Sequence, residues 1–234
     1  MQLTWYGHSC FRIETGEANI LVDPFLTGNS TFEALGIGVE DVAKGTTHVV
    51  LTHGHDDHVG DTIAICKQAN ATLVAVYELA LYLQAQGVEK IDLGNPGGTL
   101  TCAGVDVTFG TASHSSSTIV DGKPVYLGAA CGLIFKAPDA PTLYHMGDTD
   151  VISDFAIIND LYEPSIGIVP IGDRFTMGAK SAAFACRRFF RFETIIPCHF
   201  GTFPIIDQNA DAFVAEMDGH NVQVATLGET FAIS

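Results

Sequence analysis

Charged side chains are scarce in this sequence, and most of those present are acidic. Lys and Arg together number 11 among 234 residues, against 27 Asp and Glu, so the formal net charge is −16. Charged residues make up 16% of the chain, whereas soluble domains average about 25%. Because so few basic side chains cannot form the broad positive surface that nucleic acids need, we expect no nucleic-acid partner.

Long apolar runs and closely paired cysteines are also missing. No apolar run approaches the roughly 18 residues of a membrane span, so we expect no membrane partner. The first residues read as a strand rather than a secretory signal, and no Cys-x-x-Cys occurs. A cytoplasmic protein with reduced, buried thiols rather than a disulfide framework is therefore expected. The six widely spaced cysteines are Cys10, Cys66, Cys102, Cys131, Cys186 and Cys198.

Apolar residues are abundant, at 47% of the chain, which supports a large core and excludes a disordered chain. No linker, repeat or low-complexity tract divides the sequence, so residues 1–234 are expected to form one domain. Apolar segments bounded by turn residues predict strands at 3–6, 10–14, 19–22, 48–52, 72–76, 99–102, 105–109, 125–127, 131–136, 142–145, 166–170, 194–197, 222–225 and 231–233. Helical spacing predicts helices at 59–69, 78–86, 152–161, 179–190 and 210–217.

The order of these elements indicates the architecture. Strands come first, then mixed strands and helices, then two predicted hairpins (99–102 with 105–109, and 125–127 with 131–136), then mixed elements again. Two sheets packed face to face between outer helices would accommodate this order, because the free face of each sheet must be covered. We therefore expect an α/β protein with four αββα layers.

The segment Thr52-His53-Gly54-His55-Asp56-Asp57-His58 follows an apolar strand and precedes a helix. Residues two apart on an extended chain point to the same side, so His53 and His55 should project together. The chain then turns, which lets Asp57 and His58 face the same space. Imidazoles and carboxylates are ligands of borderline divalent metals, and four within six residues suggest more than one cation. A polar surface cluster is the alternative, but the place directly after a buried strand favours metal binding.

Three further candidate ligands each follow a predicted strand. His114 comes after strand 105–109, Asp148 after strand 142–145 and His199 after strand 194–197. Each residue alone is equally compatible with an ordinary capping or core position. Their repeated placement at strand ends favours the interpretation that all three are metal ligands.

The complete set of landmarks resembles the metallo-β-lactamase-fold hydrolases, which carry His-x-His-x-Asp-His followed by single His, Asp and His residues. The resemblance covers essentially the whole chain. Finer motifs resemble uncharacterised metal-dependent hydrolases related to ascorbate-6-phosphate lactonase. These motifs are Trp5-Tyr6-Gly7-His8-Ser9-Cys10-Phe11, Val22-Asp23-Pro24-Phe25, Pro170-Ile171-Gly172-Asp173-Arg174-Phe175-Thr176-Met177-Gly178 and His199-Phe200-Gly201-Thr202-Phe203-Pro204.

The resemblance implies a two-metal site at one edge of an αββα sandwich. In the family's usual arrangement one metal is held by His53, His55 and His114. The other is held by Asp57, His58 and His199, and Asp148 bridges the two. Zinc is the expected metal, and manganese, nickel and iron accept the same ligands. Members that activate oxygen at two irons carry Glu at the position of His55, so the histidine favours hydrolysis.

A dinuclear hydrolase that uses a metal-bound hydroxide on a small ester or lactone-like substrate is therefore expected. Asp57 would orient the hydroxide and accept its proton. His8, after the first strand, would act as an extra ligand, a substrate contact or a proton donor, or merely bond to backbone in a turn. Hydrolysis of phosphodiesters or phospholipids is one alternative function. A metal-stabilised binding protein without turnover is the other.

Residues of the loop after strand 166–170 are predicted to bind substrate, namely Asp173, Arg174 and Thr176. Arg174 would either hold an anionic group or pair with a surface carboxylate. Asp23 would either accept a hydrogen bond from a metal-bound imidazole or form an Asp-Pro turn. His48, His145 and His220 are interpreted as structural.

The acidity of the whole chain does not exclude a small anionic substrate. Two divalent cations would locally outweigh the carboxylates of Asp57 and Asp148. The expected partner is therefore a small molecule, with an anionic one included. The low charged fraction also leaves room for surface buried in a homo-oligomer.

Overall fold

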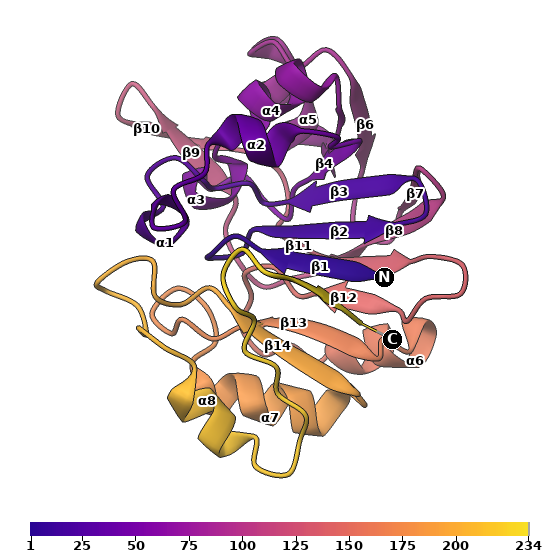
Figure 1. Cartoon of the computed structure of the whole chain (residues 1–234), viewed down its shortest axis with the longest axis vertical. Coiled ribbons are helices and arrows are strands. Elements are labelled where there is room, and N and C mark those ends of the chain that lie inside the picture. The colour runs from indigo at the N-terminus through magenta and orange to yellow at the C-terminus, as the bar shows by residue number, and fades with distance from the viewer. Residues whose placement is uncertain (234) are drawn as a thin grey trace.

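The computed structural model describes residues 1–233 and contains two large β-sheets whose outer faces are covered by helices (Figure 1). The predicted αββα arrangement is confirmed. The sheets are internal layers, because the side chains on both faces of β3 and β13 are buried. The core between the sheets is built from Leu, Ile, Val and Phe side chains of both.

The first sheet has seven strands in the order β15-β1-β2-β3-β4-β5-β6. Strands β1 to β3 and β15 pair antiparallel, whereas β3 to β6 run parallel. Their bounds are Gln2–Trp5 (β1), Phe11–Thr15 (β2), Ala18–Val22 (β3), His48–Val50 (β4), Thr72–Val76 (β5), Ile91–Gly94 (β6) and Thr230–Ala232 (β15). Because β3 and β4 are parallel, the residues that follow them meet at one edge.

The second sheet has six strands in the order β14-β13-β12-β11-β8-β7. Strand β11 pairs antiparallel with both β8 and β12, and β12 to β14 are parallel, so β8, β12 and β14 all point the same way. The bounds are Thr99–Cys102 (β7), Val105–Thr111 (β8), Cys131–Lys136 (β11), Leu143–His145 (β12), Ile166–Pro170 (β13) and Thr194–Cys198 (β14). A separate hairpin consists of β9 (Ser117–Val120) and β10 (Lys123–Tyr126).

The helices form the two outer layers and part of the site edge. Helices α4 and α5 pack on β4, β5 and β6, whereas α6, α7 and α8 lie together beyond β12 to β14 (Figure 1). Their bounds are Ser30–Glu33 (α1), Val39–Ala43 (α2), Asp56–Val59 (α3), Thr62–Ala69 (α4), Tyr77–Ala85 (α5), Phe155–Tyr162 (α6), Ala179–Phe189 (α7) and Asp211–Glu216 (α8). Within residues 1–233, no helix combines the length and the apolar character needed to cross a bilayer.

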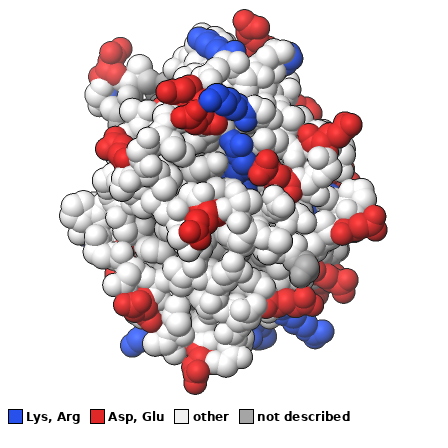
Figure 2. All heavy atoms as spheres, viewed as in Figure 1, with Lys and Arg blue, Asp and Glu red and all other residues white. Residues whose placement is uncertain are grey.

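Acidic side chains are dispersed over the face of the molecule shown in Figure 2. Repulsion between them is therefore spread over this face rather than focused at one place. The prediction of reduced, buried cysteines is also confirmed for the described part of the chain, because all six cysteines are buried and unpaired.

Three sequence predictions of local structure are wrong. Strand 125–127 does not pair with 131–136; β10 pairs with β9, and the amide of Leu127 donates to the carbonyl of Ser116. The helix predicted over 59–69 is divided, because Gly60 has a φ of +39° between α3 and α4. Segment 222–225 forms an isolated bridge from Val222 to Ile195 instead of a strand.

Candidate metal centre

The first group of candidate ligands comes from the chain between β4 and α3. His53 lies three residues beyond β4, and His55 is the residue that precedes the first turn of α3. The two imidazole rings are in contact, and Nε2 of His53 lies 3.0 Å from Nδ1 of His55. Asp57 and His58 follow in the first turn of α3, where the exposed amides favour a carboxylate. This short segment therefore gathers four metal-ligating side chains at one sheet edge.

The second group comes from the strand ends of the other sheet. His114 lies beyond β8, Asp148 beyond β12 and His199 directly after β14. His199 has a φ of +59°, which is uncommon for a residue with a side chain. Gly172 makes this conformation possible, because a Cβ there would lie 2.1 Å from the carbonyl oxygen of His199. The two sheets thus face each other with their ligand-bearing ends at the same edge.

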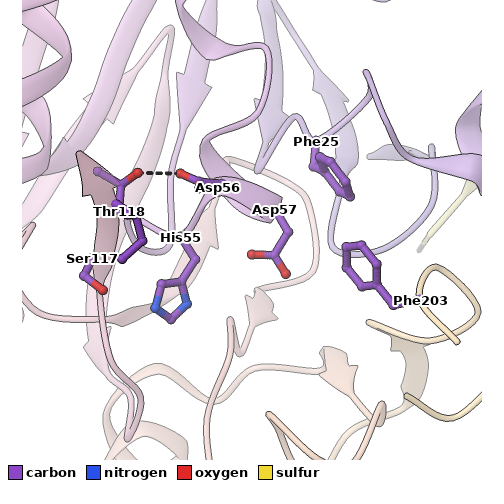
Figure 3. Close-up of a pocket in the computed structure, with 8 residues that line it drawn as sticks. Phe25, His55, Asp56, Asp57, Ser117, Thr118 and Phe203 are labelled. Carbon is purple, nitrogen blue, oxygen red and sulfur yellow. Dashed lines mark hydrogen bonds between the residues drawn. The ribbon is translucent and has the colours of Figure 1, made fainter. Parts of the chain in front are cut away.

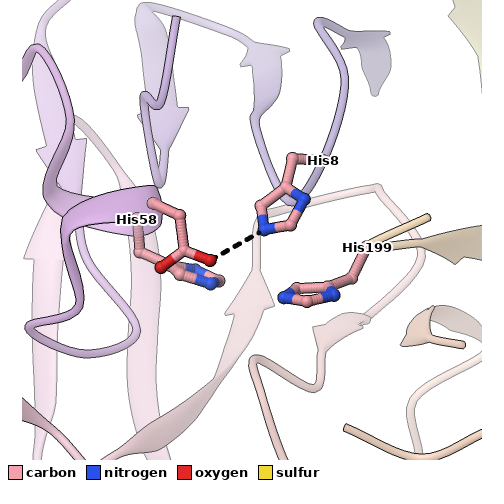
Figure 4. Close-up of side chains that lie close together, drawn as sticks. His8, His58 and His199 are labelled. Carbon is pink, nitrogen blue, oxygen red and sulfur yellow. Dashed lines mark hydrogen bonds and ion pairs between the residues drawn. The ribbon is translucent and has the colours of Figure 1, made fainter. Parts of the chain in front are cut away.

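In the described part of the chain, three sets of side chains place their ligand atoms within 4.8 Å of one another. The sets are His53 with His55 and His114; His8 with Asp57, His58 and His199; and His53 with His58 and Asp148. The structure therefore brings together all seven residues predicted as ligands. It adds His8 to one of the sets, as Figure 4 shows for His8, His58 and His199.

Asp148 lies between the sets. Its Oδ2 atom is 3.1 Å from Nε2 of His199, 3.4 Å from Nε2 of His58 and 3.5 Å from Nε2 of His114. The carboxylate thus faces imidazoles from both sides of the cluster. This is the position that a ligand shared by two cations would need.

Within residues 1–233, several polar atoms at the centre of the cluster make no hydrogen bond of acceptable geometry, although two of them face Oδ2 of Asp148. They are Nε2 of His58, both ring nitrogens of His199 and Oδ1 of Asp148, and all are shielded from solvent. Buried polar atoms are normally paired, because an unpaired one costs about 1–3 kcal/mol. Imidazole nitrogens and a carboxylate oxygen aimed at a common space fit divalent metal ions.

Asp23 orients two of the imidazoles from behind. Its buried carboxylate accepts hydrogen bonds from Nδ1 of His58 at 2.7 Å, the Thr52 hydroxyl at 2.6 Å and the Thr52 amide at 2.8 Å. The Thr52 hydroxyl also contacts Nδ1 of His53 at 2.9 Å. With both Nδ1 atoms engaged, the Nε2 atoms of His53 and His58 point into the cluster. Such supporting bonds fix the tautomer of a metal ligand.

Burial and charge set the protonation of the cluster. Burial lowers the pKa of His53, His55 and His114, so these imidazoles are neutral and can donate a lone pair. Burial alone would also lower the pKa of His58, but Asp148, Asp23 and Asp57 outweigh it and raise that pKa well above its usual value. Similarly, burial opposes ionisation of Asp148, but His199 and His58 hold its pKa well below the usual range.

His8 links the N-terminal motif to the cluster. Its Nε2 lies 3.2 Å from Oδ2 of Asp57, and its Nδ1 lies 3.0 Å from the hydroxyl of Thr202. Its backbone carbonyl accepts hydrogen bonds from the Trp5 indole at 3.0 Å and the His199 amide at 3.1 Å. Burial, followed by the nearby His199, lowers the pKa of His8 to about 4. The imidazole is therefore neutral near pH 7 and has one proton to donate.

The loop after β13 carries the three residues predicted to bind substrate, and it also carries Phe175. Asp173 and Arg174 are exposed, with φ values of +58° and +45°, and Thr176 is half-buried. Phe175 is also exposed, and it lines a cavity of about 360 Å³ together with candidate ligands from both sheets. The cavity-lining candidate ligands are His55, Asp57, His114 and Asp148.

Two contacts of the cluster were not identified from the sequence. Thr202 bonds to His8, and the Ser115 hydroxyl lies 3.2 Å from Nε2 of His55. Both residues lie within three positions of a predicted ligand in the sequence, and this proximity is the one feature of the sequence that could indicate a contact with the cluster. Many hydroxyls near a ligand serve only the backbone, however, so that signal did not distinguish them.

The fold and this cluster together define a class of protein, the metal-dependent hydrolases with a metallo-β-lactamase fold. The chain belongs to that family: the family model described as "Beta-lactamase superfamily domain" matches residues 2–199. Similar proteins are described as metal-dependent hydrolases. A "UPF0173 metal-dependent hydrolase" of Chelativorans sp. (strain BNC1) is 56% identical over 228 residues, which are 97% of this chain and 96% of that protein. The chain is accordingly a metal-dependent hydrolase.

Solved structures give the same result. Igni18, a metallo hydrolase from the archaeon Ignicoccus hospitalis, is 30% identical with a TM-score of 0.86, and the match covers 100% of this chain and 99% of Igni18. An isothiocyanate hydrolase from Delia radicum gut bacteria is 21% identical with a TM-score of 0.77, covering 100% and 99%. The second likeness shows a shared fold alone.

Proposed function

We propose that this protein hydrolyses a small ester or lactone-like molecule at a centre of two divalent metal ions. The observation that carries the proposal is the position of Asp148, whose Oδ2 lies within 3.5 Å of imidazoles on both sides of the cluster. His53, His55 and His114 would hold one ion, and Asp57, His58 and His199 the other. Zinc is the favoured metal, with manganese, nickel and iron as alternatives.

Bound divalent ions would supply an activated water at neutral pH and polarise the substrate. The protein's own residues supply the proton transfer. The side chain of Asp57 is 30% exposed, and it lines the cavity over the cluster. Burial opposes its ionisation, but His58 and His8 lower its pKa below the usual value, so the carboxylate is ionised and has lone pairs that could accept a proton.

The hydrogen bond from His8 keeps Asp57 in this orientation. Because His8 is neutral near pH 7, its single N–H can donate to Asp57 only if Nδ1 accepts from the Thr202 hydroxyl. Thr202 would therefore favour this tautomer of His8 when its hydroxyl donates to Nδ1 rather than to the Phe200 carbonyl, 3.4 Å away. A protonated Asp57 could then return its proton to the leaving oxygen, which completes ester cleavage without a further acid.

Metal analysis combined with a substrate panel tests the proposal. The purified protein should contain two divalent ions per chain and hydrolyse esters or lactones in preference to phosphodiesters. Asp148→Ala should lose at least one ion and reduce the rate at least a hundredfold, whereas Asp160→Ala, an exposed acid on α6, should change neither.

Three outcomes would contradict parts of this proposal. Asp148→Ala with two ions and full activity would refute the ligand assignment. Wild-type turnover of phosphodiesters alone would favour the alternative hydrolase, and two ions without turnover on the whole panel would favour a binding protein.

A further inference from the structure

A second cavity adjoins the metal cluster, with a volume of about 410 Å³. His55 and Asp57 line this cavity and also the one over the cluster, so the two spaces meet at these side chains. Figure 3 shows the rings of Phe25 and Phe203 on one side of Asp57, with His55 and Thr118 on the other. Its volume is in the range of small-molecule sites, which is roughly 300–1,000 Å³.

The wall on one side of Asp57 is apolar. The rings of Phe25 and Phe203 stack with 5.9 Å between their centroids. Both also meet His8, at 5.8 Å and 5.5 Å, so the apolar surface reaches the residue that bonds to Asp57. Ile119, on the opposing β9–β10 hairpin, lines the same cavity and is 61% exposed. A ligand seated here would remove three large apolar side chains from water.

This wall is held in place by hydrogen bonds on three segments. Asp61 accepts from the amides of Leu26 at 3.0 Å and Thr27 at 2.8 Å, which fixes the loop that carries Phe25. Gln208 donates to the Phe203 carbonyl at 2.8 Å. Across the cavity, the Thr118 hydroxyl donates to Asp56 at 2.6 Å and ties the hairpin to α3. Such preorganisation reduces the entropy lost when a ligand binds.

Charge in the two cavities disfavours an anionic ligand. Among residues 1–233, no Lys or Arg lines either of them, whereas Asp56 and Asp57 do line the apolar one. Arg174 is exposed and lies over the ring of Phe175, 5.6 Å from its centroid. A negative group at the Phe25–Phe203 wall would face the carboxylates of Asp56 and Asp57 with no Lys or Arg to pair with, which is unfavourable in a partly desolvated site.

We propose that the substrate is a neutral molecule with an apolar group of several carbon atoms, which packs between Phe25, Phe203 and Ile119. This inference rests on the proposed function, because the bond to be cleaved would then lie near Asp57 and the metal cluster. It replaces the expectation that Arg174 holds an anionic group. Specificity would come from the apolar cavity rather than from the loop after β13.

A series of 4-nitrophenyl esters tests the proposal on the metal-loaded protein. From acetate to butyrate and hexanoate, kcat/KM should rise about threefold to fourfold per methylene, mainly through KM. The mono-4-nitrophenyl ester of adipate, which matches hexanoate but ends in a carboxylate, should react at least tenfold more slowly than hexanoate.

The variants locate the effect. Phe203→Ala should flatten the chain-length series to less than twofold per methylene, and Phe203→Leu should keep most of it. Leu161→Ala removes an exposed apolar side chain from α6, which does not line the cavity, and should leave the series unchanged. Thermal unfolding of each variant confirms that the comparison is made between folded proteins.

Binding of two dyes separates this inference from the proposed function. N-phenyl-1-naphthylamine is neutral, and 1-anilinonaphthalene-8-sulfonate is the same molecule with a sulfonate. The neutral dye should bind at least tenfold more tightly, and Phe203→Ala should weaken it at least fivefold. This result without ester hydrolysis would support the cavity and refute ester cleavage. Ester hydrolysis with a flat series and equal dye affinities would overturn the cavity's role alone.

Discussion

Replacement of Asp23 by Asn is the sharpest test of how the imidazoles are oriented. In the native chain, Oδ2 of Asp23 accepts from both His58 and the Thr52 hydroxyl, and Oδ1 accepts from the Thr52 amide. An asparagine of the same shape presents NH₂ in place of one oxygen. In either orientation of the amide, that NH₂ faces a donor in a fully buried site.

The expected magnitude follows from these contacts. Loss of a hydrogen bond to a buried charged acceptor should lower the unfolding free energy of the metal-free protein by about 1.5–3 kcal/mol. In the neutral form that binds metal, His58 can relieve the conflict by carrying its proton on Nε2, but this removes the lone pair that faces the cluster. Loss of such support typically weakens metal binding about 10–100-fold, which corresponds to about 1.4–2.7 kcal/mol.

Competition with a chromophoric chelator measures the metal affinity, and urea unfolding of the metal-free protein measures the stability. Asp160→Asn is the matched control, because it makes the same change of charge on the exposed side of α6. An Asp23→Asn variant with metal affinity within threefold of wild type and unchanged stability would refute this account of Asp23.

Two further perturbations address other contacts. Gly172→Ala should displace His199, because the added Cβ would lie 2.1 Å from the carbonyl oxygen of His199. We expect the unfolding free energy, measured with urea, to fall by about 1–3 kcal/mol. The affinity for one ion should fall at least tenfold. Native affinity for both ions would show that His199 is not a ligand. Burial lowers the pKa of His145 from 6.5 in the folded protein. As the pH falls below 6.5, His145 therefore binds more protons in the unfolded chain than in the folded one. The unfolding free energy should then decrease as the pH falls. His145→Gln should make this decline shallower in metal-free protein between about pH 7.5 and about pH 5.5, and identical slopes would contradict the assignment.

The positions of the candidate ligands were predictable because they depend on local patterns and one rule of topology. His53, His55, Asp57 and His58 lie within a single strand–helix connection, so their proximity needs no knowledge of the rest of the fold. His114, Asp148 and His199 follow strands that run in one direction in one sheet, and such strands end at a common edge. Asp23 has two possible roles from the sequence, and the structure shows contacts for both: its carboxylate accepts from His58, and its carbonyl accepts from the Phe25 amide in a turn at Pro24.

The remaining features depend on contacts between distant segments. His8 and Thr202 are 194 residues apart, and nothing in either local sequence indicates that they meet. The apolar cavity needs Phe25, Phe203 and the hairpin with Ile119 to converge from three places. The hairpin itself was predicted with the wrong partner for β10, because an apolar strand pattern shows that a strand pairs without showing with which strand.

The ligands' origin in both sheets has a consequence for how the protein matures. His53, His55, Asp57 and His58 belong to the first sheet, but their partners His114, Asp148 and His199 emerge from the ribosome much later. A nascent chain that has formed only β1 to β6 of the first sheet therefore offers half of the residues proposed to hold each ion. Because such long-range contacts form late in folding, tight metal capture should wait until β14 has joined the second sheet. Metal loading would then mark the end of folding rather than begin it.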